Sequence, residues 1–252
     1  MIKIAIIWFP GTNCEEETLR AVHAANMAGT IVRWNQQLDE YDGYILPGGW
    51  SYEDRIRAGA IAAHDEMMEK IKNEAAAGKP ILGICNGCQI IAEAGIVPKL
   101  SKYAAEHEIA LAPNKNSLMS GYFCTHVFVK IKKKTAFTLL NEGDIIRIPI
   151  AHGEGRFITS SEQAKKIMKD NAAMVYCTQQ GEETEEFPAN PNGSLWNIAG
   201  LANDKGNVLA LMPHPERCAW PHQAGARANN ATPGLKIFQS MKRYIENGNT
   251  LC

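Results

Sequence analysis

The sequence lacks an excess of charge of either sign. Lysine and arginine together number 26, and aspartate and glutamate number 27, which leaves a formal net charge of −1. A protein that binds nucleic acid through a bulk positive field needs a clear basic excess. The balance therefore excludes that class, and we expect no nucleic-acid partner.

The chain also lacks a long apolar run and a disulfide pattern. The longest uncharged stretch of interest, residues 80–92, contains Asn86 and Gln89 and is shorter than the ~20 residues that span a membrane. The apolar run at residues 2–7 leads into Pro10-Gly11 with no small-residue cleavage site, so it indicates a buried strand rather than a signal peptide. Seven scattered cysteines, an odd number, fit a reducing compartment. We expect a soluble cytoplasmic protein with no membrane partner.

Two further absences concern ATP and domain boundaries. No Gly-rich loop ends in Lys-Ser or Lys-Thr, which argues against ATP binding through a phosphate-binding loop. No internal repeat, low-complexity segment or composition break divides the chain. With 45% hydrophobic residues available for a core, we predict a single domain over residues 1–252.

The first hundred residues alternate between apolar strand-like runs and segments with helical spacing. Glycine and proline residues separate these segments. The pattern predicts strands at 2–7, 30–34, 44–46 and 80–84, and helices from Thr12 or Asn13 to Gly29, over 58–77 and over 88–94. This alternation is typical of a parallel sheet with helices on both faces.

The second half contains more strands and fewer helices. The pattern predicts strands at 123–131, 144–150, 172–177, 195–202 and 208–212, and a closing helix at 235–245. Residues 204–207 form a turn of the kind that joins antiparallel strands. We therefore predict an α/β fold with a mostly parallel central sheet, helices on both faces, and antiparallel strands in the second half.

The sharpest local feature is Gly83-Ile84-Cys85-Asn86-Gly87. It lies where an apolar strand meets a helix, the position of a nucleophile elbow, in which a strained turn lifts the middle side chain above the sheet. The helix N-terminus favours the thiolate of such a cysteine, and the N–H of Asn86 would face an oxyanion. The alternative is an ordinary strand–turn–helix junction with a buried cysteine.

A second feature is Pro213-His214-Pro215-Glu216-Arg217. The prolines favour an extended backbone for the residues before them, and alternate residues of an extended chain project to the same side. Glu216 would then orient the imidazole of His214 and stabilise its protonated form. With Cys85, these residues supply a candidate nucleophile, base and orienting acid.

Two weaker features accompany them. Gly48-Gly49 follows a predicted strand and can turn a backbone N–H toward a ligand, which makes Gly49 a second candidate oxyanion donor. Cys85 and Cys88 form a C-x-x-C, a spacing that also suits a redox pair or half of a zinc site. Because no second metal-binding pair follows, we predict no metal site, while the redox alternative stays open.

These residues resemble those of the class I, or triad, glutamine amidotransferases. Longer motifs are more closely similar to the glutaminase subunits of phosphoribosylformylglycinamidine synthase, and the similarity runs over about residues 3–244. The motifs occur in the order expected for that family, at residues 10–14, 48–52, 83–89, 151–157, 190–194 and 213–217.

The resemblance implies a role for each site residue. Cys85 is the nucleophile, His214 the general base and acid, and Glu216 the group that orients His214. Backbone N–H groups of Gly49 and Asn86 hold the oxyanion.

The resemblance also implies the wider reaction. Gln89 belongs to the substrate site, and glutamine is hydrolysed to glutamate and ammonia through a thioester on Cys85. The ammonia passes to a separate synthetase subunit, which uses ATP to convert formylglycinamide ribonucleotide to formylglycinamidine ribonucleotide in purine biosynthesis. No cofactor is expected in this chain, whereas ATP and Mg are expected on the synthetase subunit, with a small accessory subunit as a further partner.

Other functions stay open from the residues alone. The chain could be a stand-alone cysteine hydrolase or peptidase, a non-catalytic interaction subunit, or a redox protein that uses Cys85 and Cys88. We expect residues 152–156 to lie near bound glutamine or the partner. The segment 218–232 is predicted to be a long loop that contacts the partner.

Overall fold

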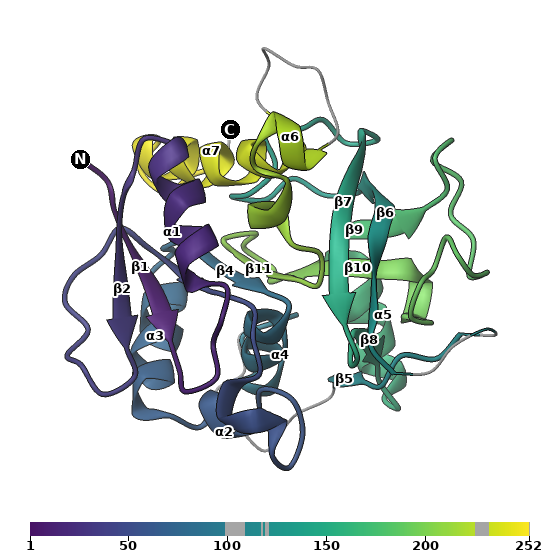
Figure 1. Ribbon diagram of the computed structural model, residues 1–252, viewed down its shortest axis with the longest axis horizontal. Coiled ribbons are helices and arrows are strands. Elements are labelled where there is room, and N and C mark those ends of the chain that lie inside the picture. The colour runs from purple at the N-terminus through teal and green to yellow at the C-terminus, as the bar shows by residue number, and fades with distance from the viewer. Residues whose placement is uncertain (99–108, 117, 119–120, 225–231, 252) are drawn as a thin grey trace.

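The computed structural model of the chain describes residues 1–98, 109–116, 118, 121–224 and 232–251. Within these residues a mixed sheet of nine strands runs through the molecule in the order β2-β1-β3-β4-β11-β10-β9-β6-β7 (Figure 1). The strands are β1 (Lys3–Trp8), β2 (Ala28–Arg33), β3 (Gly43–Leu46), β4 (Ile81–Ile84), β6 (Phe123–Ile131), β7 (Ile145–His152), β9 (Ala172–Cys177), β10 (Ile198–Ala202) and β11 (Val208–Leu211). A separate two-stranded sheet joins β5 (Ala110–Ala112) to β8 (Arg156–Ile158).

The sheet changes from parallel to antiparallel at β11. Strands β2, β1, β3, β4 and β11 pair in parallel, and β11, β10, β9, β6 and β7 pair antiparallel. Strands β3, β4 and β11 are buried along their whole length, as expected for parallel strands covered on both faces. The predicted fold class is confirmed, and every antiparallel pair of the nine-stranded sheet is formed by strands that follow residue 122.

The helices cover both faces of the parallel part. A Cβ added to Gly43 in β3 would lie 2.5 Å from Met241, whereas one added to Gly83 in β4 would lie 2.5 Å from Ile91. Gly83 is level with Leu46, three residues after Gly43, and residues an odd number apart in a strand face opposite sides. The helices that these contacts identify, α7 and α4, therefore lie on opposite faces.

The helices of the described residues are α1 (Glu15–Ala24), α2 (Ala60–Ala63), α3 (Glu66–Ala76), α4 (Asn86–Glu93), α5 (Glu162–Asn171), α6 (Pro221–Ala224) and α7 (Pro233–Glu246).

The first predicted helix ends earlier than expected. Helix α1 begins after Cys14, which makes no side-chain capping bond, and it ends at Ala24 rather than at Gly29. Gly29 belongs to β2, which starts at Ala28 because the whole segment pairs in parallel with β1. The predictions of a cap at Thr12 or Asn13 and of a strand starting at residue 30 were therefore wrong.

The predicted helix over 58–77 is two helices. Its second part restarts at Asp65, whose side chain accepts a hydrogen bond from the N–H of Met67 and caps α3. Two other boundaries also differ, because α4 begins at Asn86 rather than Cys88 and residues 195–197 form a 3-10 turn before β10. The sequence pattern did not predict β5, β8 or α5.

The buried apolar side chains form one cluster that includes residues of both halves of the chain. Within the described residues, no helix combines the length and the apolar character that crossing a bilayer requires.

Candidate active site

Cys85 lies between β4 and α4 with a strained backbone. Its φ is +51° and its ψ is −103°, a conformation that residues with a side chain rarely adopt and that is common at functional sites. The turn is tight, since a Cβ added to Gly87 would lie 1.9 Å from the carbonyl oxygen of Leu46 in β3. The strand-to-helix turn of a nucleophile elbow is therefore present, with the Sγ of Cys85 3.5 Å from the carbonyl oxygen of Ala151.

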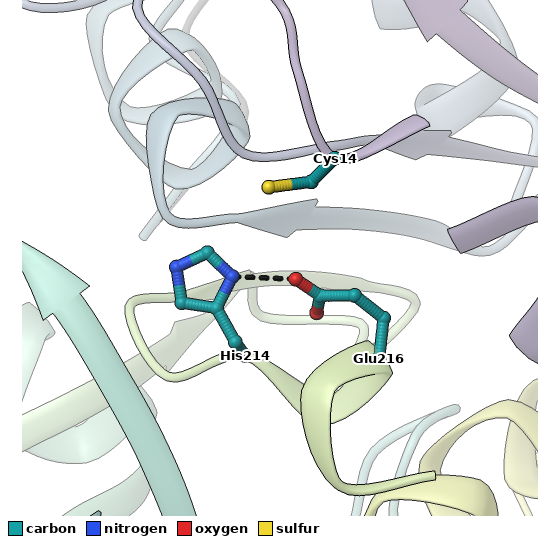
Figure 2. Close-up of side chains that lie close together, drawn as sticks. All are labelled: Cys14, His214 and Glu216. Carbon is teal, nitrogen blue, oxygen red and sulfur yellow. Dashed lines mark hydrogen bonds and ion pairs between the residues drawn. The ribbon is translucent and has the colours of Figure 1, made fainter. Parts of the chain in front are cut away.

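His214 and Glu216 form a buried pair beyond the end of β11. The Nδ1 of His214 lies 2.5 Å from the Oε1 of Glu216 (Figure 2), and both side chains are almost completely buried. His214 is extended, as the prolines predict, but Glu216 belongs to the 3-10 turn η3 (Pro215–Cys218). The two side chains thus meet across a turn rather than along an extended segment.

The environment of His214 favours its protonated form. Burial opposes the positive charge, but the carboxylate of Glu216 and then the sulfur of Cys85 outweigh it and hold the pKa of His214 well above its ordinary value. An imidazole of this kind takes a proton readily and keeps it until an acceptor arrives. Its Nε2 is buried and has no partner among the described residues.

The side chains of Cys85 and His214 converge on Gly48. A Cβ added there would lie 2.9 Å from the Cε1 of His214, 3.2 Å from the Sγ of Cys14 and 3.4 Å from the Cβ of Cys85. Residues 129 positions apart in the sequence (214 − 85) therefore meet at the ends of two neighbouring strands, β4 and β11.

A pocket opens over this convergence. Of the six predicted site residues, Cys85, His214, Gly49 and Gln89 line it. Glu216 lies behind His214, and Asn86 turns its side chain away, its Oδ1 accepting a hydrogen bond from the N–H of Ser51 at 3.0 Å. The outer wall carries Trp50 and Tyr122, about half exposed, with ring centroids 5.9 Å apart.

A hydrogen-bond chain leads from the helix start to the loop after β7. The Nδ2 of Asn86 donates to the Oε1 of Gln89 at 2.9 Å and to the Oδ1 of Asp54 at 3.3 Å. The Nε2 of Gln89 donates to the carbonyl oxygen of Glu154 at 2.7 Å. Asp54 also lines the pocket, and burial, with the negative charge of Glu154, raises its pKa to about 6.

Cys14 and Arg217 form a contact beside the pair. The Nη2 of Arg217 donates to the Sγ of Cys14 at 3.0 Å, and its Nε lies 3.7 Å from the Oε1 of Glu216. Ligand atoms of Cys14, His214 and Glu216 lie within 4.8 Å of one another (Figure 2), a donor set that suits zinc. The guanidinium of Arg217 already supplies a cation to the same sulfur and carboxylate, so the cluster gives no reason to place a metal there.

The surroundings of Cys88 disfavour the redox alternative. Its side chain is completely buried in α4. Burial, followed by the charge of Cys85, raises the pKa of its thiol well above the ordinary value. Thiol–disulfide exchange needs an accessible thiolate, and this thiol is neither accessible nor easily ionised.

Known proteins share this architecture along nearly the whole chain. The sequence model of the CobB/CobQ-like glutamine amidotransferase domain matches residues 1–245. Phosphoribosylformylglycinamidine synthase subunit PurQ of Methanothrix thermoacetophila is 46% identical, over 97% of this chain and 98% of its own. The same subunit of Pyrococcus horikoshii is 42% identical, over 98% of this chain and 100% of its own.

The chain belongs to the PurQ family. The resemblance that the motifs indicate is thereby confirmed. A chain in the solved structure of PurLQS from Thermotoga maritima is 32% identical to it, with a TM-score of 0.77 over 97% of this chain and 99% of that one. The family relation thus extends from the sequence to the fold.

In this PurQ-family chain, the segment 152–156 contributes to the pocket. His152 and Gly153 line it together with Cys85, and the carbonyl oxygen of Glu154 accepts a hydrogen bond from Gln89. The segment is predicted to lie near bound glutamine or a partner, but its motif indicates no separate role for His152. Asp54 was not predicted as a pocket residue either. Tyr52, Glu53 and Asp54 all have positive φ, and no local sequence signal marks that turn.

The predicted partner loop at 218–232 is only partly described. Residues 221–224 form α6 rather than a loop, and residues 225–231 lie outside the described residues.

Proposed function

We propose that this chain is the glutaminase subunit of a phosphoribosylformylglycinamidine synthase, in which Cys85, His214 and Glu216 hydrolyse glutamine. The observation that carries the proposal is the strained Cys85 beside the buried His214–Glu216 pair, within a chain of the PurQ family. A subunit with a degenerate site would have lost one of these groups, and all three are present.

The first half of the reaction forms the thioester. His214, supported by Glu216, takes the proton of the Cys85 thiol, and the sulfur attacks the side-chain amide carbon of glutamine. As the first residue of α4, Asn86 has a backbone N–H without an intrahelical acceptor. That N–H and the N–H of Gly49 would hold the oxyanion. Collapse of this intermediate transfers the proton from His214 to the departing nitrogen, which leaves as ammonia.

The second half releases glutamate. His214 takes a proton from a water molecule, whose oxygen attacks the thioester carbon. The C–S bond then breaks, the proton returns to the sulfur, and glutamate leaves. Burial of the pair limits the routes by which bulk water reaches the thioester before ammonia has gone.

We further propose that ammonia passes to an ATP-dependent synthetase subunit, which converts formylglycinamide ribonucleotide to formylglycinamidine ribonucleotide. ATP and Mg belong to that subunit, this chain holds no cofactor, and a small accessory subunit completes the complex in the cytoplasm. The likeness to a chain in the PurLQS structure supports this assembly. The half-exposed Trp50 and Tyr122 at the pocket and the segment 218–232 are candidate contacts with the partner.

Labelling with a diazoketone analogue of glutamine tests the proposal. We expect one label per chain at Cys85, read by intact mass and peptide mapping, with protection by excess glutamine. Cys85→Ser is the control and should not be labelled. If no label appears even with the synthetase subunit present, the glutaminase function is wrong and a non-catalytic interaction role replaces it.

Reconstitution separates the subunit from a stand-alone hydrolase. Glutamine hydrolysis that rises severalfold on addition of the synthetase subunit and its substrates supports the complex. Equal hydrolysis with and without that subunit, together with turnover of other amides, would favour the stand-alone enzyme.

A further inference from the structure

A second imidazole lines the pocket beside the nucleophile. His152 ends β7 and is almost completely buried. The residue before it, Ala151, provides the carbonyl oxygen that the Sγ of Cys85 approaches to 3.5 Å. His152 and His214 line the same pocket, yet the proposed reaction uses only His214.

The hydrogen bonds of Asn114 fix the tautomer of His152. The Nδ2 of Asn114 donates to the carbonyl oxygens of Gly121 at 3.0 Å and of His152 at 2.7 Å. Its Oδ1 is therefore the acceptor, and it receives the N–H of Gly155 at 3.1 Å. The Nδ1 of His152, 3.0 Å from the same oxygen, must carry a hydrogen. In a neutral imidazole the other nitrogen then has only a lone pair, so Nε2 is an acceptor.

The ring is held neutral and in one orientation. Burial, and then the positive charge of His214, lowers the pKa of His152 to about 3. Gly155 lies against the ring so closely that a Cβ there would be 2.3 Å from Cε1 and 2.7 Å from Nε2. His152 therefore does not serve as a general base at neutral pH, and it cannot turn its Nε2 elsewhere.

Among the residues that the structure describes, no neighbouring group satisfies this acceptor. The Nε2 of His152 is buried without a hydrogen-bond partner among the described residues, and so is the Nε2 of His214, so the two imidazoles do not bond each other. Cys85 directs its Sγ to Ala151 instead. His152 lines the pocket, and a desolvated acceptor on a pocket-lining residue discriminates strongly between ligands that bring a donor and ligands that do not.

We propose that the Nε2 of His152 accepts a hydrogen bond from the carboxamide N–H of the substrate and so distinguishes glutamine from glutamate. The inference rests on the proposed function, which makes glutamine the substrate and glutamate the product. The carboxamide nitrogen carries two hydrogens, whereas the carboxylate of glutamate carries none and would face the lone pair with an oxygen. The same contact would hold the nitrogen with its lone pair toward His214 as the C–N bond breaks, and would favour release of glutamate afterwards.

Two variants separate this role from a structural one. In His152→Asn the amide nitrogen can replace Nδ1 toward Asn114, but no acceptor remains at the position of Nε2. In His152→Gln the longer side chain can present an oxygen there. Both are measured in the complex with the synthetase subunit, as the KM and kcat for glutamine and the inhibition constant for glutamate.

We expect His152→Asn to lower kcat/KM for glutamine by about 10- to 100-fold. Its preference for glutamine over glutamate, taken as the ratio of the glutamate inhibition constant to the glutamine KM, should fall at least about tenfold. His152→Gln should recover part of both. Equal weakening of glutamine and glutamate binding, with the ratio unchanged in His152→Asn, would overturn the proposal and leave a structural role.

A measurement without substitution of His152 covers the case in which the variants fold poorly. The chain with 15N-labelled histidine and Cys85→Ser is titrated with glutamine and with glutamate in the complex. We expect the Nε2 resonance of His152 to be that of an unprotonated nitrogen and to shift on addition of glutamine but not of glutamate. A protonated Nε2, or an equal response to both, would contradict the inference. If the wild-type complex does not hydrolyse glutamine at all, the proposed function itself fails, a result distinct from normal turnover with an unchanged ratio in the variant.

Discussion

The ends of β11 and β7 each bring a histidine to the same pocket, and the two histidines have opposite properties. At the end of β11, a carboxylate 2.5 Å from Nδ1 holds the pKa of His214 above its ordinary value. At the end of β7, the neutral amide of Asn114 meets Nδ1, and burial lowers the pKa of His152 to about 3. Both rings are almost fully buried. The carboxylate beside His214, which His152 lacks, is therefore a main physical reason why the first imidazole suits the proposed proton transfer and the second the proposed fixed acceptor.

Removing the carboxylate from the β11 side should have the largest effect. Glu216→Gln gives His214 an amide partner like that of His152, so the support for its protonated form disappears. We expect kcat for glutamine to fall by about 10³- to 10⁴-fold, the scale seen when an orienting carboxylate becomes an amide. Steady-state kinetics in the reconstituted complex provide the measurement. Glu17→Gln is the matched control, because Glu17 also approaches Arg217, at 3.6 Å, and its loss should change kcat less than tenfold. A comparable loss in both variants would remove the special role of Glu216.

Giving a carboxylate to the β7 side is the converse change. Asn114→Asp places a negative charge beside the Nδ1 of His152, which should raise the pKa of His152 and put a proton on Nε2. The pocket would lose its acceptor, and we expect kcat/KM for glutamine to fall by about 10- to 100-fold. Titration of the 15N-labelled imidazole and kinetics test this together. Asn116→Asp is the control, since Asn116 donates to the carbonyl oxygen of Pro191 instead. An unchanged pKa of His152 would contradict the comparison.

The two histidines should also contribute to the free energy of unfolding with opposite pH dependence. His152 has a folded pKa of about 3 against an ordinary value of 6.5. Between these pH values the unfolded chain binds a proton that the folded chain does not. The contribution of His152 to the free energy of unfolding is therefore complete above pH 6.5 and is lost as the pH falls from 6.5 toward 3. His214, with its pKa raised, contributes stability below pH 6.5 that is lost as the pH rises through its folded pKa.

Denaturant unfolding from pH 6.5 to 4.5 tests the His152 part. The free energy of unfolding of the wild type should fall more steeply with decreasing pH than that of His152→Gln, by up to about 1.4 kcal/mol per pH unit. Equal slopes in the two proteins would mean that His152 titrates normally in the folded chain.

The smallest effect on turnover is expected at Cys88, three residues from the nucleophile. Cys88→Ser should leave glutamine turnover within about twofold and lower the free energy of unfolding by about 1–3 kcal/mol, because it buries a hydroxyl in an apolar site. Cys85→Ser, in contrast, should abolish turnover. Loss of activity in Cys88→Ser without unfolding would restore the redox interpretation.

The sequence predicted well what depends on local pattern. Short apolar runs placed β1, β4 and β11 within one residue at each end, and the glycines around Cys85 predicted its strained turn. The break at Asp65 was missed because a capping side chain restarted a helix inside a continuous helical pattern. Strands β5 and β8 were missed because three residues carry too little periodicity.

The site residues likewise fall into those that a local motif predicts and those that only the structure reveals. Cys85, His214 and Glu216 stand in recognisable motifs, and the structure brings them together. The partner of His152 lies 38 positions away at Asn114, and its significance depends on which nitrogen carries the hydrogen, which follows only from the surrounding hydrogen bonds. Asp54 is brought to the pocket by consecutive residues with positive φ. This backbone conformation could not be predicted from the sequence, because none of these residues is a glycine.

The adjacency of β4 and β11 also bears on when the enzyme becomes active during its synthesis. Translation delivers the N-terminus first, so Cys85 emerges from the ribosome long before β11 and His214, the proposed base, which follows that strand. Until residues 208–216 have joined the sheet beside β4, the cysteine has no imidazole to take its proton. By the proposed mechanism, a nascent or prematurely terminated chain would therefore be inert toward glutamine and would release no ammonia.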